Sequence, residues 1–274
     1  MLYGGKRVSD EASITMIKLH RHSFLGKRNS VIYVPSDRAI TKSIIRNGYW
    51  EKEEVRHLSE KALQAHRKVS LIDLGAHAGL ISLQILNLVP GISKAVLVEP
   101  VPLHAKCVNL NLIPFKSKIE LCNIALAKEA GIREGFTDVA NRGNFTLEHT
   151  AAANKYESIR VETIGARKFS QSLSSLEGDL ILKSDLQGLD AEVLDEFDSE
   201  VWERTIACVI EVWSLPAVNK ETVESLVKKL QLHFSVWEIH LMDFESRMKV
   251  SPDELSSRWT DSSGRYTNLF LTKY

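Results

Sequence analysis

Short apolar runs alternate with helix-like stretches along most of the chain. Apolar residues dominate five runs, at 69–75, 94–100, 118–126, 179–188 and 205–213. Runs of this length without polar alternation are typical of strands buried on both faces. Helical patterns or helix stop signals mark the stretches between them, at 80–89, 102–113, about 191–197 and 220–233. The alternation predicts a mostly parallel sheet with helices on both faces.

The two ends of the chain depart from this alternation. Residues 235–243 and 266–274 are strand-like with no clear helix between them, which predicts an antiparallel finish to the sheet. Before the first run, the pattern predicts a strand at 29–35 and a helix at 49–66. We therefore expect residues 1–68 to form an N-terminal cap and residues 69–274 to form the main domain. Polar, glycine-containing sequence at 127–158 predicts loops or a hairpin.

The stretch LIDLGAHAGL, residues 71–80, places an acid and two glycines at the end of the first buried strand. Gly75 and Gly79 let the backbone turn tightly and approach a ligand. The helix that starts near Gly79 offers free backbone N–H groups at the same edge. Glu99 ends the next strand, where a carboxylate can accept both hydroxyls of a ribose. The pattern predicts half of a nucleoside-binding site.

The spacing of these glycines bears on which nucleoside cofactor is bound. Gly75-Ala76-His77-Ala78-Gly79 does not fit the GxGxxG fingerprint of dinucleotide sites. Asp73, just before the loop, suits a cofactor with a positive centre and no pyrophosphate. S-adenosylmethionine, with its sulfonium and amino groups, fits this description. The alternative is that Asp73 caps the helix and the glycines only form a turn.

Several motifs then resemble, in order, the FkbM-type S-adenosylmethionine-dependent methyltransferases. The glycine loop resembles the family's Asp-x-Gly-Ala-x-x-Gly, and VLVEPVP resembles its Glu-Pro-x-Pro. LILKSDLQGLDAEVL, residues 180–194, resembles its most specific stretch, Lys-Ile-Asp-Val-Glu-Gly-x-Glu-x-x-Val-Leu. The resemblance covers about residues 34–213 and also includes NIAL (123–126) and the lead-in VPSDRAITKSIIRNGYWEKEEV (34–55). His77, Ser184, Asp190 and the stretch VETIGARKF depart from the family pattern.

The resemblance implies a Rossmann-like class I methyltransferase fold with seven strands, the C-terminal one antiparallel. It implies methyl transfer from S-adenosylmethionine to a hydroxyl, often of a carbohydrate or related natural product, with S-adenosylhomocysteine as the product. Residues 69–274 are then the catalytic domain. The cofactor-binding residues expected on this basis are Asp73, Gly75, Ala76, His77, Gly79, Glu99, Pro100, Asn123, Ala125 and Asp185, with Asn123 and Ala125 beside adenine.

Three residues are candidates for catalysis. Asp185 ends the fourth strand, where a base would activate the acceptor hydroxyl; its alternative role is a helix cap or cofactor ligand. Glu211 lies inside the apolar run VIEVW, where a buried acid is costly unless it reaches a partner or the site. His149, in the loop-rich stretch, is a candidate for contact with the acceptor. Asp185 with Glu211 or Asp190 offers oxygen ligands for Mg²⁺, but this spacing is not diagnostic and no metal is predicted.

Composition narrows the choice of cellular compartment and of binding partner. The three cysteines show no CxxC pattern, which favours a reducing compartment. No apolar run approaches the length of a membrane helix, and the N-terminus shows no signal-peptide pattern, so we expect a cytoplasmic protein. Residues 1–69 hold 14 Lys and Arg against 7 Asp and Glu, but they show no stripe of alternating aromatic and basic residues of the kind typical of nucleic-acid strand binding, so no nucleic-acid partner is expected. The expected partner is a small-molecule or glycan acceptor, and a homo-oligomer is left open. The alternatives are an N-methyltransferase and a non-catalytic, methyltransferase-like binding protein.

Overall fold

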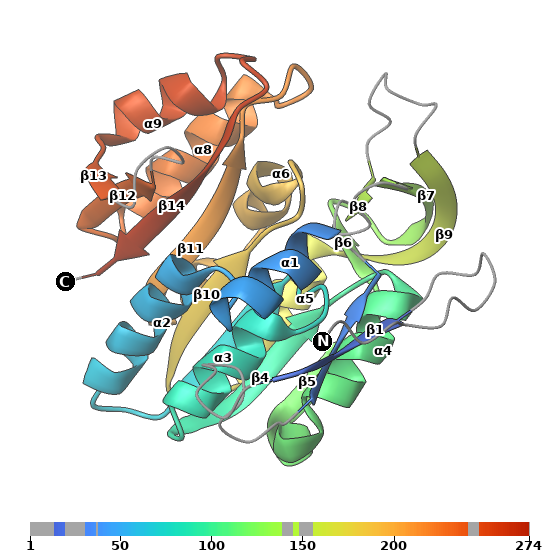
Figure 1. Cartoon of the computed structure of the whole chain (residues 1–274). Coiled ribbons are helices and arrows are strands. Elements are labelled where there is room, and N and C mark those ends of the chain that lie inside the picture. The colour runs from blue at the N-terminus through green and yellow to red at the C-terminus, as the bar shows by residue number, and fades with distance from the viewer. Residues whose placement is uncertain are drawn as a thin grey trace.

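The computed structural model describes residues 14–19, 31–36, 38–138, 145–147, 156–240 and 247–273. Its centre is an eight-stranded sheet in the order β13-β12-β14-β11-β10-β3-β4-β5 (Figure 1). The strands are β3 (Val69–Leu74), β4 (Ile92–Val98), β5 (Ile119–Cys122), β10 (Asp179–Ser184), β11 (Thr205–Trp213), β12 (Val236–His240), β13 (Arg247–Lys249) and β14 (Tyr266–Thr272).

The first five strands in chain order are parallel, whereas β14 runs antiparallel to β11 and β12. The chain starts at β3, moves outward through β4 to β5, and then returns to the other side of β3 with β10. This order confirms the predicted Rossmann-like methyltransferase fold with its antiparallel C-terminal strand. The sheet has eight strands rather than the seven expected, because β13 adds an edge strand beside β12. The reversal between β3 and β10 is the point at which open α/β sheets bind ligands, beyond the carboxyl ends of the strands.

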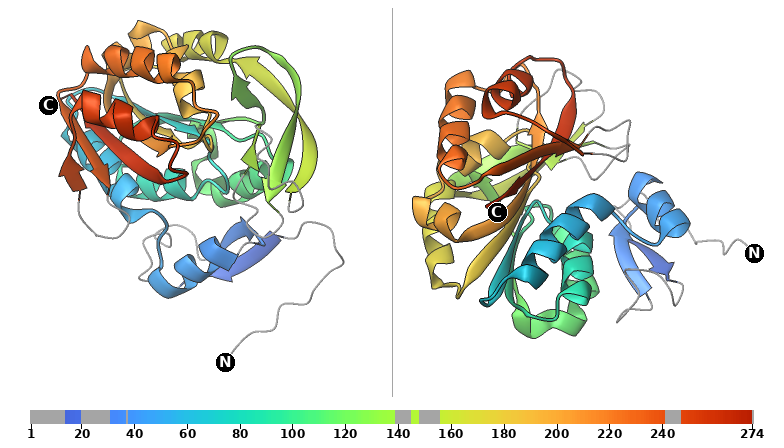
Figure 2. Two further views of the ribbon diagram at one scale, coloured as in Figure 1. Left: turned by 90° about the horizontal axis from the view of Figure 1, so that it is seen from above. Right: turned by 90° about the vertical axis from the view of Figure 1, so that its left-hand side faces the viewer.

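Helices cover both faces of the sheet (Figure 2). Strand residues alternate between two apolar clusters, so that Leu71 packs with the layer of α2, α3 and α4, and Ile72 packs with the layer of α6, α7 and α8. The helices are α1 (Arg38–Asn47), α2 (Lys52–Gln64), α3 (Leu80–Leu88), α4 (Pro102–Asn111), α5 (Ala166–Ser172), α6 (Asp190–Asp195), α7 (Ser199–Arg204), α8 (Lys220–Gln231) and α9 (Pro252–Trp259). Within the described ranges, no helix combines the length and apolar character that a membrane span requires.

A second sheet of four strands lies beside the carboxyl edge of the first. Its order is β6-β9-β7-β8, with β7 and β9 antiparallel, which confirms the hairpin predicted within residues 127–158. The predicted strand at 118–126 is wrong in one respect, because it divides into β5 and a strand of this second sheet. The strands are β6 (Ala125–Ala127), β7 (Gly131–Asp138), β8 (Phe145–Thr146) and β9 (Tyr156–Gly165).

The described N-terminal residues pack against the outside of the α3–α4 layer (Figure 2). Strands β1 (Ile14–Lys18) and β2 (Val31–Pro35) form an antiparallel pair, and β2 contacts α4. Asn111 at the end of α4 accepts a hydrogen bond from the Tyr33 backbone N–H at 2.7 Å and donates to the carbonyls of Tyr33 and Ala78. The N-terminal pair is therefore tied to the glycine loop, and its role as a substrate-side cap stays a prediction.

The prediction that no helix separates the C-terminal strands is wrong. Helix α9 lies between β13 and β14. Only Leu255 and Trp259 of this helix are buried, so its apolar stripe is too narrow to stand out in the sequence. A local signal is present: the Ser251 hydroxyl accepts a hydrogen bond from the Glu254 N–H at 3.2 Å, as expected from an S-x-x-E start with proline in the first turn.

Candidate functional site

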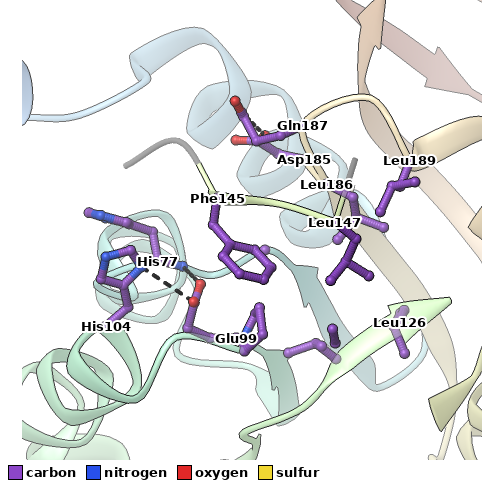
Figure 3. Close-up of a pocket in the computed structure, with 14 residues that line it drawn as sticks. His77, Glu99, His104, Leu126, Phe145, Leu147, Asp185, Leu186, Gln187 and Leu189 are labelled. Carbon is purple, nitrogen blue, oxygen red and sulfur yellow. Dashed lines mark hydrogen bonds and ion pairs between the residues drawn. The ribbon is translucent and has the colours of Figure 1, made fainter. Parts of the chain in front are cut away.

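Two adjoining cavities lie at the carboxyl edge of the sheet, where β3, β4 and β10 end. The smaller, shown in Figure 3, has a volume of about 60 Å³, and the larger has a volume of about 350 Å³. Gly75, His77, Asp185 and Gln187 line both cavities. The predicted cofactor edge and the predicted catalytic carboxylates therefore belong to one continuous site.

Gly75, directly after β3, packs against the backbone of Asp185, directly after β10. Its φ of 75° lies in the left-handed region, and its N–H donates to the Val98 carbonyl at 3.0 Å. A Cβ placed on Gly75 would lie 1.9 Å from the Asp185 carbonyl oxygen. Gly79, with φ 71°, turns the chain into α3. The absence of a side chain at Gly75 thus allows the loop to sit against the end of β10.

Glu99 connects the end of β4 to the glycine loop. Its Oε2 accepts a hydrogen bond from the His77 backbone N–H at 2.7 Å, and its Oε1 accepts one from the Val101 N–H at 2.8 Å. His104 Nδ1 lies 3.3 Å from Oε1 (Figure 3). Since each carboxylate oxygen accepts more than one hydrogen bond, Glu99 can also receive ligand hydroxyls in the smaller cavity that it lines.

One ring nitrogen of His77, Nε2, is buried at the cavity wall. Its ring lies edge-on to His104 with the centroids 4.2 Å apart. Burial and the neighbouring His104 lower the pKa of His77 well below its ordinary value, so the ring is neutral. Within the described ranges, no hydrogen-bond partner reaches His77 Nε2. A buried polar atom without a partner at a cavity wall points to a ligand that supplies one.

The smaller cavity has apolar walls. Pro100 and Ala125, both predicted cofactor residues, line it together with Leu126, Phe145 and Leu147. Asn123 lines neither cavity, and its side-chain amide donates to the Glu99 carbonyl at 2.6 Å. Asn123 therefore fixes the backbone of Glu99, and the expectation that its side chain meets adenine is revised.

Asp73 lies beneath the glycine loop and lines neither cavity. It is fully buried, and its Oδ2 accepts a hydrogen bond from the Ser82 hydroxyl at 2.5 Å. Its Oδ1 lies 3.9 Å from Lys183 Nζ. Asp73 faces α3 because it shares a strand face with Leu71, so its charge meets Lys183 rather than a cationic ligand. The expected direct cofactor contact of Asp73 becomes a supporting role.

Lys183 is a buried cation that the sequence reading did not identify. It pairs in register with Asp73 across β3 and β10. Its ammonium donates to the Gly75 carbonyl at 3.0 Å and to Asp185 Oδ2 at 3.3 Å. Burial opposes its charge, but Asp185 and Asp73 outweigh this and raise the pKa of Lys183 above its ordinary value. The available signal was a lysine inside the apolar run LILKSD, since buried lysines are almost always paired.

Asp185 and Glu211 meet at the larger cavity, which both line. Gln187 Nε2 donates to Asp185 Oδ1 at 2.7 Å and to Glu211 Oε2 at 3.0 Å. Trp213 Nε1 donates to Glu211 Oε2 at 2.5 Å. Burial opposes the charge of Asp185, but Lys183 lowers its pKa, whereas burial and Asp185 raise the pKa of Glu211 well above its usual range. These shifts favour the ionised form of Asp185 and the protonated form of Glu211.

The predicted residues that remain are Asp190, Ala76 and His149. Asp190 lies behind the loop, where its carboxyl accepts hydrogen bonds from the Ser184 hydroxyl at 2.5 Å and the Leu186 N–H at 3.1 Å. Burial raises the pKa of Asp190 to about 7. Ala76 lines the larger cavity, and His149 lies outside the described residues. Over the described ranges, no three His, Cys, Asp or Glu side chains are placed to hold a metal ion.

Comparison with known proteins gives likenesses of fold only. No protein-family model matches the chain, and no curated protein matches it. It is similar to a precorrin-6y C5,15-methyltransferase from Geobacter metallireducens GS-15, with 14% identity over 82% of this chain and 93% of that chain and a TM-score of 0.37.

Two further solved structures are similar over much of the chain. A methyltransferase FkbM from Methylobacillus flagellatus KT shows 12% identity over 74% of this chain and 43% of that chain, with a TM-score of 0.42. An O-methyltransferase family protein from Burkholderia thailandensis shows 12% identity over 94% of this chain and 64% of that chain, with a TM-score of 0.41. The present chain thus spans less than two thirds of either protein. Both the cofactor and the activity are therefore inferred from the geometry of the site.

Proposed function

We propose that this protein is an S-adenosylmethionine-dependent O-methyltransferase of the FkbM type, acting on a hydroxyl of a carbohydrate or related natural product. The observation that carries the proposal is the meeting of two cavities at Gly75 and Asp185. One has apolar walls beside a carboxylate that can accept ribose hydroxyls. The other is larger and contains an ionised carboxylate next to a proton-holding carboxyl.

The residues present fit the cofactor. Leu126, Phe145 and Leu147 would flank adenine, and Glu99 would accept the ribose hydroxyls. The unpartnered Nε2 of His77 would gain a hydrogen bond from the ligand. Phe145 fills part of the narrow smaller cavity, and we expect its ring to turn aside when adenosine enters. When bound, S-adenosylmethionine supplies an electrophilic methyl group and becomes S-adenosylhomocysteine as its carbon–sulfur bond breaks.

The chain's own residues would supply the base. An alcohol is a weak nucleophile, so removal of its proton by a positioned carboxylate accelerates transfer by about 10²–10⁴-fold. Asp185 is that base, because Lys183 holds it in the ionised form at the cavity wall. Gln187 donates to Asp185 Oδ1 and Lys183 donates to Oδ2, and each of these oxygens can accept a further hydrogen bond from an acceptor hydroxyl in the cavity that Asp185 lines. Positioning of the acceptor oxygen by the cavity walls supplies much of the remaining acceleration.

The test is incubation with S-adenosylmethionine and a panel of sugars and polyhydroxylated natural products, with S-adenosylhomocysteine formation and product mass as readouts. We expect one methyl group on an acceptor oxygen, and its loss in Asp185→Asn. Methylation at nitrogen, without need of Asp185, would replace the proposal by an N-methyltransferase. Absence of any turnover together with absence of cofactor binding would leave a binding protein.

A further inference from the structure

The larger cavity combines aromatic walls with an unusual number of acids. Trp50, Trp213 and Tyr266 line it, and the last two rings are stacked with centroids 4.7 Å apart. Three carboxyl groups, those of Glu51, Asp185 and Glu211, line the same space. Aromatic faces and carboxylates both attract cations, the former through the negative face of the ring. The cavity therefore has two kinds of group that favour a positively charged ligand.

Carboxyl groups outnumber basic groups in the site. Among the described residues that line the larger cavity, Lys183 carries the only fixed positive charge, and it already contacts Gly75, Asp185 and Asp73. A bound S-adenosylmethionine has two positive groups and one carboxylate, so it adds one net positive charge. Burial raises the pKa of Glu51 and Glu211, so these two carboxyls favour their protonated forms. An ammonium group beside Glu51 would instead favour its ionised form, because an opposite charge nearby lowers the pKa of a carboxyl.

Glu51 is the carboxyl most clearly left for an additional ligand. No hydrogen-bond donor approaches its side chain from the part of the chain that the structure describes. Its backbone is fixed, because the fully buried Gln84 side chain accepts from the Trp50 N–H at 3.3 Å and donates to the Trp50 carbonyl at 2.8 Å. Glu51 itself has φ 46° and immediately precedes α2. The Glu51 carboxyl is thus held at the cavity by the buried contact between Gln84 on α3 and Trp50, the residue before Glu51.

His77 lies where the two cavities meet. It lines the larger cavity as well as the smaller one, and its buried Nε2 has no hydrogen-bond partner in the described ranges, so a ligand at this junction, cofactor or acceptor, would supply one. The three acids also lack the geometry of a metal site, since the described residues contain no cluster of three ligands placed for a metal. A divalent cation is therefore a poorer occupant than an organic cation, which the aromatic rings would also contact.

We propose that the acceptor carries a protonated amine in addition to the hydroxyl that is methylated, and that Glu51 binds this ammonium group against the faces of Trp50 and Trp213. The proposal rests on the proposed function, because it names the class of acceptor for the same site. Amino sugars and amino alcohols belong to this class. Neutral sugars would leave the Glu51 carboxyl without an ion-pair partner.

The test compares matched ligands that differ only in the charged group. Calorimetric titration in saturating S-adenosylhomocysteine would use glucosamine against glucose, and cyclohexylamine against cyclohexanol, at about pH 6.5, where amines with a pKa near 8 are protonated. Each amine should bind at least about tenfold more tightly than its hydroxyl counterpart, or about 1.4 kcal/mol. Glu51→Gln should abolish this preference, whereas Glu60→Gln, an exposed change on α2, should leave it intact.

The outcomes separate this proposal from the one on which it rests. Equal affinity within every pair, including absence of binding by both members, would overturn amine recognition while S-adenosylhomocysteine binding keeps the proposed function standing. A preference that survives in Glu51→Gln would also overturn the assignment. Loss of S-adenosylhomocysteine binding in the unaltered protein would instead contradict the proposed function. Retained S-adenosylhomocysteine affinity in Glu51→Gln shows that this variant is folded.

Discussion

Replacement of Gly75 by alanine tests the packing on which the whole site depends. The new methyl group would lie 1.9 Å from the Asp185 carbonyl oxygen, whereas ordinary contact begins near 3.4 Å. The loop and the end of β10 must therefore separate by about 1.5 Å. That movement strains the hydrogen bond from the Asp185 N–H to the Leu74 carbonyl, now 3.0 Å, and the bond from Lys183 to Gly75.

The expected loss in the free energy of unfolding has two parts. An alanine at a left-handed φ costs about 1–2 kcal/mol. Loss of one backbone hydrogen bond adds about 0.5–1.5 kcal/mol. We therefore expect Gly75→Ala to lower the free energy of unfolding by about 1.5–3.5 kcal/mol. Because displacement of reacting groups by about 1 Å can cost about 10²-fold in rate, methyl transfer should fall by at least that factor.

Gly264→Ala is the matched control. Gly264 has φ 69°, but a Cβ there would meet no atom within 4 Å, so the variant isolates the backbone cost from the collision. Urea unfolding gives the stability of both variants, and calorimetry gives their affinity for S-adenosylhomocysteine. Equal stability of the two variants, together with full cofactor affinity in Gly75→Ala, would refute the close approach as the reason for this glycine.

Three further predictions concern single carboxyl groups. Glu99→Ala should weaken S-adenosylhomocysteine binding at least about tenfold in calorimetry, because two backbone N–H groups lose their acceptor. The control Glu120→Ala, on the exposed side of β5, should leave this affinity unchanged. An unchanged affinity in both variants would contradict the role of Glu99. Asp185→Asn should lower kcat by about 10²–10⁴-fold while leaving S-adenosylhomocysteine affinity within a few-fold, and a normal kcat would remove it as the base. The pKa of Asp190 is raised to about 7, so the native state holds this proton more tightly than the unfolded chain does. Its contribution to stability, about 4 kcal/mol at about 1.36 kcal/mol per pKa unit, is complete below about pH 4 and is lost as the pH rises through about 7. Asp190→Asn should flatten this part of the unfolding free energy measured in urea, and curves of identical shape would show that Asp190 does not titrate there.

The sheet and the glycine loop were predictable because their signals are local. Each parallel strand lies in a mostly apolar run, and the turn after β3 requires Gly75 whatever lies elsewhere in the chain. Glu99 could be placed from its position after β4 alone. Helix α9 was not predicted from periodicity, because only Leu255 and Trp259 are buried on it. Its local signal is the helix start at Ser251, whose hydroxyl accepts from the Glu254 N–H.

The electrostatics of the site depended on pairings that the sequence does not contain. Lys183 pairs with Asp73 because the register of β3 and β10 sets the two residues opposite each other, although they lie 110 positions apart in the chain. Glu51 reaches the larger cavity from the start of α2, because Gln84 fixes the residue before it. Asn123 turned out to support Glu99 because the chain leaves the main sheet between β5 and β6 at that point. Such contacts follow only once the strands are assembled.

Calorimetric titration of the purified protein with S-adenosylmethionine and S-adenosylhomocysteine, with NAD as the control, tests the central claim most directly. We expect micromolar binding of both adenosyl compounds, no binding of NAD, and weakened binding in Glu99→Ala. Absence of binding by either adenosyl compound would mean that Gly75, His77 and Glu99 form only a turn at the edge of a sheet. The assignment as a methyltransferase would then be contradicted.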